Sequence, residues 1–341
     1  MMPQQAVQHL LDGGMFTYEQ AQTVMRHVMA GEASPVQIGA LLVLLRQRRE
    51  SVQEIAGFAS VMREKAESVE TPDGVVMDTC GTGGDASGTF NISTLAALVV
   101  AAAGVCVAKH GNRSVSSKVG SADLLEGLGM RLELTAEQVS TCMRETGFGF
   151  LYAPQHHPAM KHAVGPRREL GVRTVFNILG PLTNPASATH QVLGVYDAQL
   201  VSTVAEVLGM LGVQRALVVH GMDGVDEVSC TGPTQAAELH HGVVQERTLD
   251  LSEFGVSACS LCDLQGGELP DNLRIAESVL AGQGSTYQDA VAINAGAALY
   301  VAEKAPDLAA GTQQARDLLT TGRARDTLAK VIHFTEQAAS T

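Results

Sequence analysis

A glycine-rich polar segment at residues 78–94 is the first candidate for chemistry. It reads DTCGTGGD at 78–85 and TFNIST at 89–94, between a predicted strand at 75–77 and a predicted helix at about 91–103. Glycines let backbone N–H groups approach an anion closely, and the start of a helix adds partial positive charge. The arrangement favours a phosphate site. A purely structural glycine-rich turn followed by an ordinary helix cap would have the same sequence pattern.

Two familiar phosphate motifs do not fit this segment. Ala86 stands where the dinucleotide-binding sequence G-x-G-x-x-G needs its last glycine, and no Gly-Lys-Ser/Thr follows as in a Walker A loop. Asn91, Ser93 and Thr94 can cap the helix or bond phosphate oxygens. The Ser93 hydroxyl can also bind Mg²⁺ carried on a pyrophosphate, because this cation prefers oxygen ligands.

A cationic polar segment, KHGNRSVSSK at 109–118, follows the next predicted strand at 105–108. Residues 109–121 hold two Lys, one Arg and four Ser. Parallel strands end at a common edge of a sheet, so this segment should lie beside the glycine-rich one and attract phosphate. Ser121 and Asp123 also fit an N-cap and a first-turn acid, which would make that part structural.

Two further groups of residues could bind ions. Asp226 and Glu227 follow a predicted strand at 216–219, where adjacent carboxylates suit Mg²⁺ or simply form a solvated acidic turn. Arg167 could bind a carboxylate through two parallel hydrogen bonds. The nearby histidines, His156, His157 and His162, lack the cysteine or carboxylate spacing of a zinc site.

Other reaction classes find little support. Cys259 and Cys262 form one C-x-x-C without a second pair, so they are interpreted as structural thiols. No G-x-S-x-G sequence accompanies a Ser, His and Asp series, which disfavours acyl transfer. The net charge of −13 disfavours nucleic acid and anionic membranes as partners. With no signal-peptide pattern at 1–14 and a longest apolar run of only 14 residues, we expect a cytoplasmic protein.

The elements that must position these residues fall into two groups. Up to about residue 70 the apolar residues recur with helical spacing, and turn residues at 71–74 mark a boundary. Strands then alternate with helices, which predicts a mostly parallel sheet covered on both faces. Residues 167–188 interrupt that rhythm and are predicted to be irregular, as a crossover back to the helical part. Helix-start signals stand at Thr17-x-x-Gln20, Ser34-Pro35 and Ser51-x-x-Glu54.

Taken together, these segments resemble the anthranilate phosphoribosyltransferases, and the resemblance runs from the first helices to the last. The motifs that carry it are DTCGTGGD at 78–85, TFNIST at 89–94, KHGNRSVSSKVGSADLLEGLG at 109–129, APQHHPAM at 153–160, RRELGVRTVFNILGPLTNP at 167–185 and VDEVSCTGPT at 225–234.

The resemblance implies a fold and a reaction. A small helical domain, 1–72 joined by 168–188, would accompany a large α/β domain, 73–167 and 189–341, of the nucleoside phosphorylase/phosphoribosyltransferase kind. Two copies would form a homodimer through the helical domain. The reaction would transfer the 5-phosphoribosyl group of phosphoribosyl pyrophosphate (PRPP) to the amine of anthranilate, as a step in tryptophan biosynthesis.

The resemblance also implies the site residues, and this sequence matches the family pattern at each of them. Mg²⁺, two per subunit and carried with PRPP, would be served by Ser93, Asp226 and Glu227. Anthranilate would be lined by Gly81, His110, Asn112, His157 and Arg167. PRPP would be held by Gly81, Thr82, Gly84, Asp85, Thr89, Asn91, Ile92, Ser93, Thr94, Lys109, His110, Gly111, Asn112, Arg113, Ser114, Val115, Ser116, Ser117 and Ser121.

Two rival functions share the implied fold. A pyrimidine nucleoside phosphorylase has a different phosphate loop, which this chain does not match. A nucleic-acid-binding relative would be basic with degraded PRPP motifs, whereas this chain is acidic and its motifs are intact.

Overall fold

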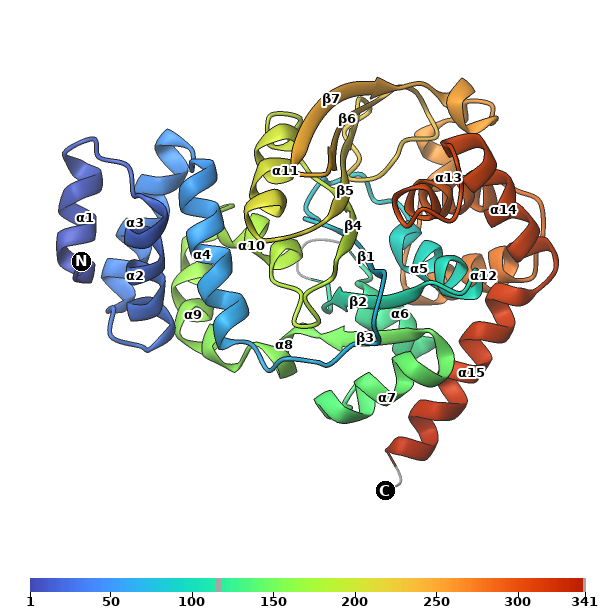
Figure 1. The fold of residues 1–341 in the computed structure, drawn as a ribbon, viewed down its shortest axis with the longest axis horizontal. Coiled ribbons are helices and arrows are strands. Elements are labelled where there is room, and N and C mark those ends of the chain that lie inside the picture. Colours follow the sequence, from blue (N-terminus) through green and yellow to red (C-terminus); the bar gives the residue numbers. More distant parts are fainter. Residues whose placement is uncertain (115–117, 340–341) are drawn as a thin grey trace.

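The computed structural model describes residues 1–114 and 118–339. Three of the expected phosphate contacts, Val115, Ser116 and Ser117, therefore lie outside the described residues. The chain begins with four helices, shown in blue in Figure 1: α1 (Pro3–Leu11), α2 (Tyr18–Met29), α3 (Pro35–Arg48) and α4 (Val52–Lys65).

The predicted helix starts are confirmed. Thr17, Ser34 and Ser51 each accept a hydrogen bond from the backbone N–H three residues on, and the Gln or Glu at that position bonds back to the cap residue. These reciprocal bonds satisfy donors that would otherwise lack partners in the first turn. They fix where α2, α3 and α4 begin.

A seven-stranded sheet occupies the centre of the described chain, in the order β3-β2-β1-β4-β5-β6-β7. The first five strands in that order are parallel and the last two pairings are antiparallel, so the mostly parallel sheet is confirmed. The strands are β1 (Val76–Gly81), β2 (Cys106–Gly111), β3 (Phe148–Tyr152), β4 (His190–Gly194), β5 (Arg215–Gly221), β6 (Thr234–His240) and β7 (Val243–Leu249).

Helices cover both faces of the sheet, as predicted (Figure 1). The apolar helix α5 (Ile92–Ala102) packs directly on one face together with α13 (Thr286–Val301), and α14 (Leu308–Thr320) packs behind α13. The opposite face is covered by α11 (Leu200–Met210), which in turn contacts α4. The remaining helices of the α/β part are α6 (Ser121–Gly127), α7 (Ala136–Thr146), α8 (Ala153–His156), α12 (Leu269–Leu280) and α15 (Arg323–Ala338).

The strands extend further into the polar motifs than predicted. Residues 78–81 pair with β4 as part of β1, and residues 109–111 pair with β3 as part of β2. Backbone pairing does not depend on the polarity of the side chains, provided that each buried polar group finds a partner. The three strands β3, β6 and β7 were not predicted at all, although the β6–β7 connection carries a turn signal at His241-Gly242, both with positive φ.

The prediction of an irregular segment at 167–188 is wrong in part, since only 171–175 and 183–188 lie outside helices. It contains the end of α9 (Lys161–Leu170) and the helix α10 (Phe176–Leu182), each with an internal proline. The helices form because Phe176, Leu179 and Leu182 lie in the apolar cluster shared by α2, α3, α4 and α11. Burial of this face outweighs the backbone hydrogen bonds that the prolines cannot make. In the described residues, no helix combines the length and the apolar character needed to cross a bilayer.

Candidate functional site

The glycine-rich and cationic segments lie side by side, because β1 and β2 are adjacent parallel strands. Lys109 at the end of β2 reaches across and donates from Nζ to the Thr79 carbonyl at 2.5 Å. Asn91, just before α5, donates from Nδ2 to the Val119 carbonyl at 3.1 Å. The two segments therefore form one region at the carboxyl edge of the sheet, as the sequence predicted.

The glycine-rich segment folds over the Asp226 carboxylate. Gly83 donates its backbone N–H to Asp226 Oδ2 at 2.6 Å. A Cβ on Gly81 would collide with the same carboxylate, so glycine is required there for this close approach. The loop from β1 and the loop after β5 are thereby held against each other.

Three carboxylates, Asp85, Asp226 and Glu227, form a group that we call the acidic cluster. The Asp226 N–H donates to Asp85 Oδ2 at 3.4 Å, and Glu227 Oε1 accepts the Ser93 N–H at 3.2 Å. Burial, with the Asp85 charge nearby, raises the pKa of Asp226 to about 7. Burial, with the Asp226 charge nearby, raises the pKa of Glu227 to about 8.

The acidic cluster suits a divalent cation. Among the described residues, no Lys, Arg or His nitrogen lies within 4.0 Å of these carboxylates to neutralise them. Mg²⁺ accepts one or two carboxylates and completes its shell with water and phosphate oxygens. In the described part of the chain no three His, Cys, Asp or Glu side chains are arranged to hold an ion without such help. The ion would thus depend on oxygens from water or a bound phosphate.

Lys109 and Asp78 form a buried pair of opposite charges beneath the loops. Lys109 is only 2% exposed, and burial lowers its pKa while the Asp78 charge raises it. Asp78 accepts from Asn184 Nδ2 at 2.8 Å and from the His110 N–H at 3.3 Å. Neither Asp78 nor Asn184 was predicted to be a site residue, although both stand inside the motifs that carry the resemblance.

The exposed cations of the second segment already have partners. Arg113 donates to Asp123 at 3.0 Å and to Glu126 at 2.7 Å and 3.0 Å, and Lys118 lies 2.8 Å from Glu268. The predicted excess of positive charge is therefore smaller than the sequence alone indicates.

The start of α6 departs from the sequence interpretation. The N-cap of α6 is Gly120 and not Ser121, whereas Asp123 is the first-turn acid, as predicted, and accepts the Gly120 N–H at 2.9 Å. Ser121 Oγ instead donates to the Asn112 carbonyl at 3.3 Å, inside the same loop. Asn91 does precede α5, but its side chain makes no cap bond there.

Two neutral histidines lie next to the end of β2. The rings of His110 and His157 are 5.1 Å apart, and burial lowers their pKa to about 3 and about 4. His110 Nδ1 lies 3.2 Å from the Gly180 carbonyl and so carries the proton, which leaves Nε2 as an acceptor. Neither Nε2 has a hydrogen-bond partner in the described structure, although both are buried.

Arg167, on α9, has a guanidinium that no acid neutralises in the described residues. It lies over the Phe176 ring, 4.9 Å from the centroid, and burial lowers its pKa. A half-buried cation resting on an aromatic ring is well placed to receive a carboxylate from outside the chain.

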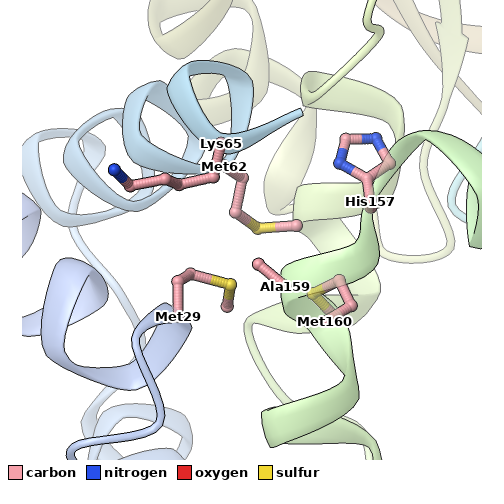
Figure 2. A pocket seen from close by; sticks show the side chains of 6 residues that line it. All are labelled: Met29, Met62, Lys65, His157, Ala159 and Met160. Carbon is pink, nitrogen blue, oxygen red and sulfur yellow. The ribbon is translucent and has the colours of Figure 1, made fainter. Parts of the chain in front are cut away.

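The other side of His157 borders the helical part of the molecule. Figure 2 shows Met29 and Met62 facing Ala159 and Met160, with His157 and Lys65 at opposite ends of a small hollow. The hollow measures about 10 Å³, which is barely room for one water molecule. It is a packing gap between α2, α4 and the turn after α8, too small for a substrate.

Family comparisons cover nearly all of the chain. Residues 4–66 match the helical bundle domain of the glycosyl transferase family, and residues 73–325 match its a/b domain. The anthranilate phosphoribosyltransferase of Alkalilimnicola ehrlichii is 52% identical over 98% of this chain and 99% of that protein. That of Nitrosomonas europaea is 48% identical over the full length of both.

Solved structures agree with these relatives. Anthranilate phosphoribosyltransferase from Thermus thermophilus matches with a TM-score of 0.92 and 46% identity, covering 97% of this chain and 99% of that one. The Saccharomyces cerevisiae enzyme in complex with PRPP and Mg matches with a TM-score of 0.90 and 25% identity, covering 98% of both chains. This chain therefore belongs to the anthranilate phosphoribosyltransferase family.

Proposed function

We propose that this chain transfers the 5-phosphoribosyl group of PRPP to the amine of anthranilate, giving N-(5-phosphoribosyl)anthranilate and pyrophosphate. The observation that carries the proposal is the acidic cluster, whose carboxylates form no ion pair within the described residues and lie against a glycine-rich loop and a helix start. A diphosphate that arrives with Mg²⁺ would supply both a cation for these carboxylates and an anion that the loop can bind.

We infer that Ser93, Asp226 and Glu227 serve Mg²⁺. The Ser93 N–H already bonds Glu227, so the serine and the carboxylates lie in one place. When bound, the metal would stabilise the negative charge that develops on the departing pyrophosphate. The complex of the yeast relative with PRPP and Mg supports this assignment, which we extend to two ions per subunit.

The glycine-rich and cationic segments would hold the rest of PRPP. Lys109 sits beneath the two loops, where its positive charge favours the ionised forms of Asp78 and Glu227 and would also attract the anions of a bound diphosphate. Asn91 Oδ1 is buried without a partner and could accept a hydrogen bond from a sugar hydroxyl. Each of these groups is in place before substrate binds, which reduces reorganisation during the reaction.

We infer that Arg167 binds the anthranilate carboxylate, while His110 and His157 line the path of the ring. The amine of anthranilate is neutral at pH 7 and already nucleophilic, so the protein needs to position it rather than deprotonate it. With a pKa of about 3, His110 is a poor base but a good neutral acceptor for an amine N–H. The yeast relative's complex with 4-fluoroanthranilate supports a site for this acid. We assign no catalytic base.

The decisive experiment mixes the protein with anthranilate and PRPP and follows the loss of anthranilate fluorescence, with and without Mg²⁺. We expect the signal to fall only when PRPP and Mg²⁺ are both present. No loss of fluorescence, together with phosphorolysis of thymidine or uridine, would favour the phosphorylase alternative. A salt-dependent gel shift with DNA or RNA would favour the nucleic-acid-binding alternative.

We also propose a homodimer formed through a helical domain made of 1–72 and 168–188. Apolar side chains on α1 and α3 are exposed, including Leu11, Val43 and Val36, which is 81% exposed. A second copy would remove them from water. Sedimentation equilibrium should give twice the chain mass, and Val36→Asp should shift the protein towards monomer. A cytoplasmic location stays a prediction from the sequence.

A further inference from the structure

Arg173 connects the helical part of the molecule to the glycine-rich loop. It lies in the link between α9 and α10, is exposed, and donates from Nη2 to the Gly84 carbonyl. Its guanidinium rests on the Tyr196 ring, 4.4 Å from the centroid. This arginine is not among the predicted site residues and has no part in the proposed function.

The contact fixes the direction of one peptide group. Gly84 has φ +74°, a conformation natural to glycine, and the chain contains no cis peptide bond in its described part. In a trans peptide the C=O and the following N–H point in opposite directions. When Arg173 holds the Gly84 carbonyl, the Asp85 N–H must therefore point away from Arg173, and the Asp85 side chain stays near Asp226.

Tyr196 ties the same arginine to the start of the loop. Its buried ring supports the guanidinium, and its backbone N–H donates to Thr82 Oγ1 at 3.0 Å. Thr82 in turn donates its N–H to the Gly194 carbonyl of β4 at 2.9 Å. The loop is thus held at Thr82 by β4 and at Gly84 by Arg173.

We propose that Arg173 is a positioning residue for PRPP binding, acting through the Gly84 carbonyl with Tyr196 as its support. This inference rests on the proposed function. Arg173 orients the Asp85 N–H and carboxylate for the diphosphate and its metal. Through the same hydrogen bond it fixes the glycine-rich loop relative to the α9–α10 link. It makes no contact with substrate itself.

The test measures equilibrium binding of PRPP with Mg²⁺ to the full-length protein by titration calorimetry, alongside the KM for each substrate. Arg173→Ala should weaken PRPP binding by about tenfold, the loss of one charge-assisted hydrogen bond, and raise the KM for PRPP far more than that for anthranilate. Arg168→Ala removes an exposed arginine of α9 that makes no side-chain hydrogen bond or ion pair within the described residues, and should change neither value.

Tyr196 separates positioning from direct contact with phosphate. Tyr196→Leu should reproduce most of the Arg173→Ala effect, Tyr196→Phe should not, and the double variant should be no worse than Arg173→Ala alone. Fully additive effects, or an unchanged PRPP affinity in Arg173→Ala, would overturn the inference. Failure of the wild-type protein to bind PRPP would instead overturn the proposed function. If Arg173→Ala does not fold, Arg173→Lys, which lacks the planar fork, should give a smaller shift in the same direction.

Discussion

The acidic cluster and the exposed cations of the cationic segment differ in whether their charges have partners within the chain. Arg113 is exposed and bonded to Asp123 and Glu126, so its charge is already matched within the chain. Asp226 and Glu227 are partly buried beside another acid, Asp85, and form no ion pair within the described residues, although the Lys109 charge lowers the pKa of Glu227. Exposed pairs of the first kind contribute little to stability, whereas unmatched charges of the second kind cost stability. Buried carboxylates that remain without an ion-pair partner therefore point to a site that a ligand completes.

Asp226→Asn should have the largest effect. Removing a charge that holds the metal should lower kcat/KM on the order of 100-fold at a fixed Mg²⁺ concentration, and move the metal requirement to higher concentration. A Mg²⁺ titration of the initial rate measures both. Glu126→Gln, from the matched pair in the cationic segment, is the control and should leave the titration unchanged. An unaltered midpoint in Asp226→Asn would remove its assignment as a metal residue.

Arg167→Ala extends the comparison to a cation that, like the acidic cluster, has no ion partner in the described chain. We expect the KM for anthranilate to rise roughly tenfold or more, because a bidentate charged hydrogen bond is lost, with a much smaller change for PRPP. Steady-state kinetics with each substrate varied in turn measures this difference. Equal changes for both substrates would contradict the assignment of Arg167 to the carboxylate.

The pH dependence of stability should reveal the acidic cluster directly. The pKa of Asp226 rises from an ordinary 3.8 to about 7, and that of Glu227 from 4.5 to about 8. Between about pH 4 and pH 8 these two carboxyls bind more protons in the folded protein than in the unfolded chain, so their contribution to stability falls as pH rises through this window. His110 and His157, whose pKa values are lowered, act in the opposite direction below about pH 6.5, so the net fall should be clearest between pH 7 and pH 8. Urea unfolding of metal-free protein at pH 5, 6, 7 and 8 measures the slope.

Two comparisons separate the contribution of the acidic cluster to this pH dependence from that of the other titrating groups. Asp226→Asn should show a shallower fall than the wild type, because one of the shifted carboxyls is gone. Mg²⁺ with PRPP should also flatten the slope, since a cation favours the ionised carboxylates. An identical slope in Asp226→Asn and wild type would argue against the raised pKa.

Arg113→Gln should have the smallest effect. Breaking an exposed ion pair should change the free energy of unfolding by less than about 1 kcal/mol and the KM for PRPP by less than about threefold. Chemical denaturation and steady-state kinetics provide the two values. A tenfold rise in the KM for PRPP would mean that Arg113 leaves its acids to bind substrate, as the sequence indicated.

Local sequence was sufficient for features that depend on neighbouring residues. The helix starts at Thr17, Ser34 and Ser51 follow from side chains three residues apart, and the alternation of strands and helices predicted the mostly parallel sheet. The juxtaposition of the glycine-rich and cationic segments followed from the rule that parallel strands end at one edge. The family resemblance then supplied the names of substrates that no spacing rule could provide.

Only the tertiary structure decided which charges are matched. The partners of Arg113 lie ten and thirteen residues away and those of Asp226 lie in another loop, 141 and 143 residues away, so spacing could not reveal them. The helices at 161–182 were missed for a similar reason, since burial against distant helices overrides two prolines. Residue types and short spacings thus determined the components of the site. Long-range packing determined their desolvation and pairing, because both depend on what the whole fold brings near each group.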